Sequence, residues 1–121
     1  MSNLIRVCLI GAGRAGKVHA NSLVKYIPAG KLVGIIDPVA EVLDDTANEF
    51  GIENRFESLE AALEWGKFEA VVITTPTFTH KSLAVTAAEA GKHVFLEKPM
   101  ALTLAECDEM IEATQRSGVL L

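Results

Sequence analysis

The chain has 121 residues, of which half are hydrophobic and 22% are charged, and its formal net charge is -5. This length and balance are those of one globular domain with its own core, which excludes a disordered or fibrous chain. The acidic charge and the eleven scattered Lys and Arg residues indicate no nucleic-acid partner, because nucleic-acid binders carry clustered basic side chains.

The apolar runs of the sequence are no longer than strands. They fall far short of the ~20 apolar residues that span a bilayer, so no membrane segment is expected. The N-terminal apolar run leads into a glycine motif without a small-residue cleavage site, so it is not a signal peptide. Cys8 and Cys107 have no CxxC spacing and no neighbouring His ligand, which predicts two reduced core residues and no metal site. These features favour a cytoplasmic protein.

Strand-length apolar runs alternate with segments of helical period, a pattern typical of βαβ units and a parallel sheet. The strands are almost continuously apolar, as expected where helices cover both faces of a sheet. The sequence therefore predicts an α/β fold, a doubly wound parallel sheet of the Rossmann type, as one domain over residues 1–121. The expected strands are Ile5–Ile10, Lys31–Ile36, Arg55–Phe56, Ala70–Thr74 and His93–Leu96, and the expected helices are Arg14–Tyr26, Ala40–Phe50, Ser58–Trp65, Thr79–Ala90 and Thr103–Ser117.

The first strand leads into the motif GAGRAG and then into a helix. Gly11 is expected to make a tight turn, Gly13 to let the backbone approach a pyrophosphate, and Gly16 to let helix and strand pack closely. Amide groups at the helix N-terminus and the helix dipole favour the negative charge of the phosphates. A glycine turn without a ligand is the alternative. The predicted dinucleotide-binding residues of this motif are Gly11, Ala12, Gly13, Arg14, Ala15 and Gly16.

Asp37 ends the second expected strand, about 20 residues after the glycine motif, where an acid binds the ribose hydroxyls of a dinucleotide. Its carboxylate would repel a 2′-phosphate, and the following residues Pro38, Val39 and Ala40 supply no base to offset that repulsion. The cofactor is therefore predicted to be NAD rather than NADP. The alternative is that Asp37 caps the next helix.

A polar turn, Thr75-Pro76-Thr77, follows the fourth expected strand, at the edge where open α/β sheets bind their ligands. Thr75, Pro76 and Thr77 are predicted to contact the cofactor. The structural alternative is that Pro76 shapes the turn, and Thr79 is expected to cap the next helix. His80, in the first helical turn, is a further candidate for the cofactor site, with a packed helix residue as the alternative.

The fifth expected strand ends in Glu97-Lys98-Pro99, at the same edge of the sheet. Pro99 restricts Lys98 to an extended backbone and so aims its side chain. Beside a nicotinamide, the Lys98 ammonium would hold a substrate hydroxyl and stabilise the alkoxide that develops during hydride transfer. Glu97 would pair with Lys98 or bind the nicotinamide side of the cofactor. A plain surface ion pair is the alternative.

Together these motifs resemble the glucose-fructose oxidoreductase/inositol dehydrogenase/rhizopine catabolism family, written Gfo/Idh/MocA, over the whole chain. The resemblance implies an NAD-dependent dehydrogenase that transfers a hydride between NAD and an alcohol carbon of a sugar, cyclitol or related polyol. It makes Lys98 the substrate-positioning or acid/base lysine and places Glu97 in the cofactor crevice. His19 fits the family pattern without an assigned chemistry. The matching motifs are GxGxxGxxHA from Gly11 to Ala20, Asp37-Pro38, Thr75-Pro76 with His80, and Glu97-Lys98-Pro99.

Members of that family continue into a second α/β domain, which carries most of the substrate pocket, the dimer surface and an Asp and a His that assist the lysine. Residues 118–121 are predicted to begin a sixth buried strand, so the chain is expected to be a cofactor domain cut from a longer, homo-oligomeric enzyme. Alone, it is expected to bind NAD without turnover. The alternatives are a non-catalytic NAD-binding or sensing module, and an amino-acid-pathway dehydrogenase, which accounts less well for Glu97-Lys98-Pro99.

Overall fold

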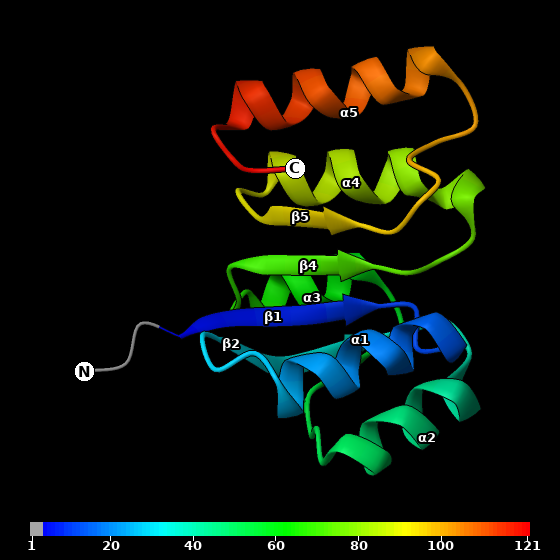
Figure 1. The fold of residues 1–121 in the computed structure, drawn as a ribbon, viewed down its shortest axis with the longest axis vertical. Coiled ribbons are helices and arrows are strands. Elements are labelled where there is room, and N and C mark those ends of the chain that lie inside the picture. The colour runs from blue at the N-terminus through cyan, green and yellow to red at the C-terminus, as the bar shows by residue number, and fades with distance from the viewer. Residues whose placement is uncertain (1–3) are drawn as a thin grey trace.

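A five-stranded parallel sheet forms the centre of the molecule in a computed structural model that describes residues 4–121 (Figure 1). The strand order is β3-β2-β1-β4-β5. The strands are β1 (Ile5–Ile10), β2 (Gly30–Ile36), β3 (Arg55–Phe56), β4 (Ala70–Ile73) and β5 (His93–Leu96). The helices are α1 (Arg14–Lys25), α2 (Ala40–Phe50), α3 (Leu59–Trp65), α4 (His80–Glu89) and α5 (Leu104–Ser117), with the 3₁₀ turn η1 (Thr77–Thr79) before α4.

Helices cover both faces of the sheet, which confirms the predicted doubly wound α/β fold. One core lies between the sheet and helices α1 and α2, and it contains Leu9, Ile35 and Ala47. The other core lies between the sheet and helices α3, α4 and α5, and it contains Ile73 and Met110. Both cores are almost wholly apolar because each strand points alternate side chains to opposite, covered faces.

The element boundaries agree closely with those expected, and two caps explain why. Ser58 accepts a hydrogen bond from the Ala61 N–H, and Thr103 accepts one from the Glu106 N–H, so both side chains fix the start of a helix. The Glu106 carboxylate reaches back to the Leu102 N–H, so Thr103 and Glu106 nearly complete a capping box. No helix within residues 4–121 is long and apolar enough to cross a bilayer.

The segment after α5 follows the free edge of β5. The Val94 N–H donates to the Leu120 carbonyl oxygen at 2.9 Å, and the Leu120 N–H donates to Nδ1 of His93 at 3.0 Å. Leu120 is 74% exposed and belongs to no strand, so a sixth strand in this place stays a prediction.

Both cysteines are free thiols. Cys8 is fully buried in β1, and this burial raises the pKa of its thiol to about 12. Cys107 is half-buried in α5, so only Cys8 is a true core residue. Within residues 4–121, no group of three His, Cys, Asp or Glu side chains is arranged to hold a metal ion.

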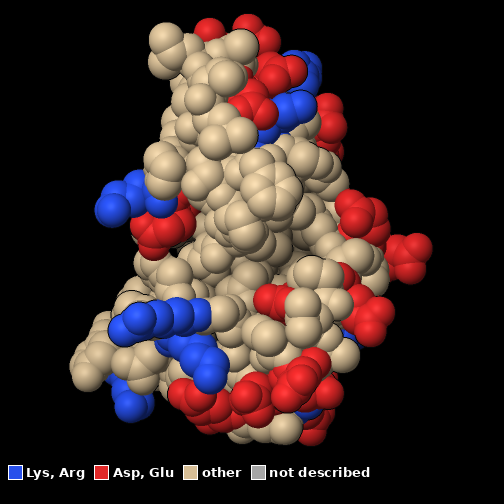
Figure 2. Space-filling model, turned by 90° about the vertical axis from the view of Figure 1, so that its right-hand side faces the viewer, with Lys and Arg blue, Asp and Glu red and all other residues tan. Residues whose placement is uncertain are grey.

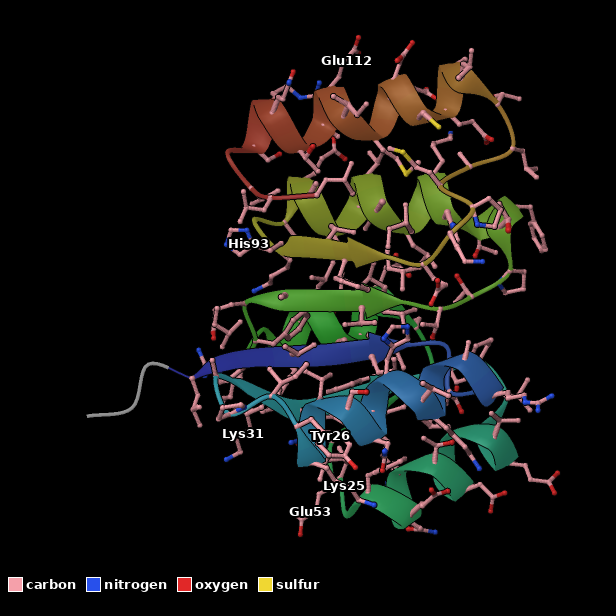
Figure 3. All side chains as sticks on the ribbon, viewed as in Figure 1. Lys25, Tyr26, Lys31, Glu53, His93 and Glu112 are labelled. Atoms are coloured by element: carbon pink, nitrogen blue, oxygen red, sulfur yellow. The ribbon has the colours of Figure 1, made fainter. Side chains whose placement is uncertain are left out.

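The common direction of the strands gathers the predicted site residues at one edge. All strand pairs of the sheet are parallel, as Figure 1 shows for β1, β4 and β5, so the residues that follow β1, β2, β4 and β5 lie at their shared carboxyl edge. His93 begins β5 and lies at the opposite edge with Lys31, as Figure 3 shows. His93 is therefore excluded from the site.

Two glycines of the GAGRAG motif let α1 pack closely on the end of β1. Gly11 has φ +96°, a conformation that other residues rarely adopt. A Cβ atom added to Gly16 would lie 2.0 Å from the Gly11 carbonyl oxygen. A Cβ atom added to Gly13 would meet no atom within 4 Å. The fold thus needs Gly11 and Gly16, whereas Gly13 faces open space.

Replacing Gly16 by Ala is expected to destabilise the domain by about 1–3 kcal/mol, the usual range for overpacking, because α1 must move away from β1. This loss should outweigh the gain of about 1 kcal/mol that Ala brings to a helix interior. The matched control is Gly13→Ala, whose new methyl group meets no protein atom. Urea unfolding followed by circular dichroism compares the two variants, and equal stabilities would contradict this packing.

Candidate active site

The carbonyl groups of the glycine loop are held by two threonine side chains. The Thr74 hydroxyl lies 2.8 Å from the Gly11 carbonyl oxygen, and the Thr46 hydroxyl donates to the Ala12 carbonyl oxygen at 2.8 Å. Gly13 is the N-cap of α1 and offers no capping side chain. The first amides of α1, which have no intrahelical acceptor, are therefore left for an anionic ligand.

Asp37 joins the end of β2 to the glycine loop. Its Oδ2 accepts the Ala12 N–H at 2.9 Å, and its Oδ1 accepts the Val39 N–H at 2.9 Å. The N-cap of α2 is Val39, without a side-chain cap, so the alternative that Asp37 caps this helix as its N-cap is wrong. Each carboxylate oxygen has a second lone pair, so both oxygens can still accept a hydroxyl group.

A crevice of about 790 Å³ opens along the carboxyl edge of the sheet. Figure 2 shows this face of the molecule, with uncharged residues in its middle and both basic and acidic side chains around them. Its charged lining residues are Asp37, Glu57 and Glu60, and no Lys or Arg of residues 4–121 lines it. The predicted site residues in its lining are Gly11, Gly13, Asp37, Thr75 and Pro76.

The crevice has the features that a bound NAD requires. It offers open space at Gly13, free amides at the start of α1 and a carboxylate beside them. A 2′-phosphate beside Asp37 would meet a carboxylate in a crevice that no Lys or Arg of residues 4–121 lines, which favours NAD over NADP. The residues present therefore fit NAD, and cofactor contacts of the individual residues stay predictions.

The turn after β4 is closed by Thr79. The Thr79 hydroxyl lies 2.6 Å from both Thr75 Oγ1 and the Pro76 carbonyl oxygen. Thr79 is the N-cap residue of α4, as expected, but its side chain makes no capping hydrogen bond to this helix. The reason is that Thr77–Thr79 forms a 3₁₀ turn, which directs this hydroxyl back to the turn. Thr77 is half-buried in η1 and does not line the crevice.

His80 lies beneath the site with a relative exposure of 1%. Its Nε2 lies 3.0 Å from the Thr75 carbonyl oxygen, and its Nδ1 lies 3.1 Å and 3.2 Å from the Pro99 and Met100 carbonyl oxygens. The imidazole thus connects the turn after β4 with the loop after β5. Neither ring nitrogen is left to offer a cofactor, so this geometry favours the packed alternative.

Glu97 binds His19 of α1 rather than the side chain of Lys98. Its Oε2 lies 2.7 Å from His19 Nε2, and its Oε1 accepts the Lys98 backbone N–H at 3.0 Å. These two contacts, the one with His19 foremost, hold the pKa of the Glu97 carboxyl below its usual value. The expected Glu97–Lys98 side-chain pair is therefore replaced by a backbone contact.

The Lys98 side chain is exposed at the carboxyl edge. Among residues 4–121, no side chain or carbonyl forms a hydrogen bond or an ion pair with its ammonium group. Glu97 and Lys98 line a neighbouring pocket of about 370 Å³ beside Met100 and Leu121. The glycine loop and Asp37 thus line one hollow, and Lys98 lines a separate one beside β5.

The remaining motif residues take supporting positions around the glycine loop. Ala12 and Arg14 line a pocket of about 380 Å³ between α1 and α2, on the other side of the loop. Ala15 is exposed in the first turn of α1. Sequence reasoning missed Thr46 and Thr74, although Thr46 stands among the buried positions of α2, where a polar residue signals an internal partner.

The fold and the crevice define a dinucleotide-binding domain. The family model described as "Oxidoreductase family, NAD-binding Rossmann fold" matches residues 5–121. The chain therefore belongs to the Gfo/Idh/MocA oxidoreductase family, which confirms the resemblance expected from its motifs.

Curated relatives and solved structures agree with this membership. The chain is 39% identical over 120 residues to scyllo-inositol 2-dehydrogenase (NAD(+)) of Bacillus subtilis, covering 99% of this chain and 35% of the relative. It is 37% identical over 117 residues to myo-inositol 2-dehydrogenase of Thermotoga maritima, covering 97% of this chain and 35% of that relative. The WlbA dehydrogenase of Bordetella pertussis, solved with NADH and UDP-GlcNAcA, superposes with a TM-score of 0.92 at 33% identity, covering 98% of this chain and 36% of that one. The chain thus spans about a third of the length of these relatives.

Replacing Thr46 by Val should destabilise the domain by about 1–3 kcal/mol, because the buried Ala12 carbonyl loses its side-chain donor. The matched control is Thr114→Val. The Thr114 hydroxyl contacts only carbonyls of its own helix, α5, so its loss should cost less. Urea unfolding compares the two variants with the parent chain. A Thr46→Val loss no larger than that of the control would contradict the role of Thr46 in holding the loop.

Proposed function

We propose that the chain is the NAD-binding domain of an enzyme that transfers a hydride between NAD and an alcohol carbon of a sugar, cyclitol or related polyol. The observation that carries this proposal is the bond from the Ala12 N–H to Asp37, which sets a carboxylate beside the glycine loop in a crevice without bases. The relatives support the substrate class, since they include inositol dehydrogenases and a dehydrogenase solved with UDP-GlcNAcA.

Each part of the carboxyl edge has a task in this proposal. The amides at the start of α1 hold the pyrophosphate, and Asp37 accepts the ribose hydroxyls of the adenosine half. Because β2, β1, β4 and β5 lie in that order, a dinucleotide that extends from Asp37 across the glycine loop leads toward Thr75 and Lys98. NAD, when bound, supplies the carbon that accepts or donates the hydride.

Lys98 acts on the substrate in this arrangement. Its ammonium can donate hydrogen bonds to the oxygen of the reacting alcohol and stabilise the negative charge that this oxygen develops. An ammonium group outside any ion pair serves this task better than a paired one, because its N–H groups are free to donate hydrogen bonds to the substrate. The non-catalytic alternative, an NAD-binding or sensing module, gives the same ammonium only to the cofactor.

The surface of the domain supports two further parts of the proposal. An apolar groove of about 280 Å³ lies between α1 and β5, with Leu23, Ile27 and Phe95 in its lining, and supports a homo-oligomeric parent protein. The two free thiols support a reducing compartment, the cytoplasm.

Titration of the domain should show that NAD(H) binds at least several-fold more tightly than NADP(H), because a 2′-phosphate would face Asp37 without a compensating base. Gly13→Val should weaken both ligands, because its side chain would occupy the open space through which the pyrophosphate approaches. Calorimetric titration gives the affinities. Equal or reversed affinity for NADP(H) would remove Asp37 from the role proposed.

The 121-residue chain is expected to bind NAD without measurable turnover of sugars and cyclitols. Lys98 is exposed, and the pocket beside it lies along the open edge of β5, so a substrate is neither held within ~3 to 3.5 Å of the nicotinamide nor shielded from water. The turnover rate is measured from the absorbance of NADH with each sugar and cyclitol of a substrate panel. Turnover that disappears in Lys98→Ala would contradict the expectation and would still support the role of Lys98.

A further inference from the structure

His19 links the helix that begins at the glycine loop to the loop that carries Lys98. It belongs to α1, and its Nε2 lies 2.7 Å from Glu97 Oε2 at the end of β5. The two side chains are 27% and 33% exposed, so this contact is partly shielded from solvent. The His19 ring also packs edge-to-face on Phe95, with 5.7 Å between ring centroids, which fixes the plane in which its nitrogen points.

Glu97 contacts both His19 and Lys98 and so links these two residues. While Oε2 is held by His19, Oε1 accepts the Lys98 backbone N–H at 3.0 Å. The Glu97 N–H donates to the Ile73 carbonyl oxygen at 3.0 Å, which anchors the same residue to β4. The Glu97 side chain therefore fixes the position of the Lys98 backbone relative to α1. The Glu97 main chain fixes it relative to the sheet.

We propose that His19 is a positioning residue that acts through Glu97 to hold Lys98 in register with the glycine end of α1. Resting on the proposed function, this gives His19 the task of setting Lys98 relative to the nicotinamide half of a bound dinucleotide. His19 does not line the 790 Å³ crevice, and its Nε2 is engaged by Glu97, so it acts on the cofactor only through Glu97 and Lys98.

The binding test compares His19→Phe with His19→Gln in the 121-residue chain, using NADH and ADP-ribose as ligands. Phe keeps the contact with Phe95 but has no donor for Glu97, whereas the Gln amide can donate at nearly the same reach. His19→Phe should weaken NADH by about two- to tenfold and leave ADP-ribose, which lacks the nicotinamide, unchanged. His19→Gln should restore most of the NADH affinity.

The matched control is His93→Phe, the same change at the opposite edge of the sheet, which should alter neither affinity. If His19→Phe weakens both ligands to the same extent, the residue only supports the fold and the proposal is overturned. It is overturned as well if His19→Gln is as weak as His19→Phe.

A second measurement needs no ligand and therefore separates this proposal from the proposed function. In His19→Phe the pKa of Glu97 should rise toward its ordinary value, because the hydrogen bond that favours the carboxylate is lost. Carbon NMR of the Glu97 carboxyl group follows this titration, and hydrogen exchange of the Lys98 amide should become faster. Unchanged Lys98 exchange would overturn the proposal. Failure of the parent chain to bind NADH would instead overturn the proposed function.

Discussion

The approach of α1 to the end of β1 is the constraint on which the site depends. Gly16 permits it, because a methyl group at this position would lie 2.0 Å from the Gly11 carbonyl oxygen. The start of α1 sets where the amides for an anion lie, and its middle sets where His19 meets Glu97. A shift of this helix would therefore move both the amides at its start and the histidine that contacts Glu97, so the geometry of the proposed site depends on the packing that Gly16 allows.

Side chains join the loops at the carboxyl edge into one continuous row. Asp37 joins the end of β2 to the glycine loop, and Thr74 joins that loop to the end of β4. His80 then connects the turn after β4 with the loop after β5, and Glu97 connects that loop back to α1. Most of these bonds end on backbone groups, so they fix the path of the chain as well as single side chains. Four loops that are separate in the sequence thus behave as one preorganised surface.

The fold could be predicted almost completely, because strand-length apolar runs and cap residues report local preferences that the tertiary structure keeps. The contacts between these elements could not be predicted from the sequence. In α5, helical periodicity places Leu104, Met110 and Ile111 on one face, yet only Met110 is buried, and Leu104 and Ile111 are 84% and 41% exposed. Ala113, which that face does not contain, is fully buried. Two apolar stripes overlap on this helix, and periodicity alone does not say which one faces its neighbour. In the same way, the type of residue at Glu97 indicated a charged partner, but only the fold supplies His19 as that partner.

Electrostatics at the carboxyl edge act at short range rather than through the charge of the whole domain. The chain is acidic, and the crevice is lined by Asp37, Glu57 and Glu60, so its overall field repels a pyrophosphate. At physiological ionic strength such repulsion between exposed charges fades within about 8 Å. In the proposed complex, the amides at the start of α1 would contact the pyrophosphate directly, where neither salt nor distance weakens them. Asp37 would reject an additional 2′-phosphate at contact, so the proposed site would combine affinity for the pyrophosphate with selectivity for NAD.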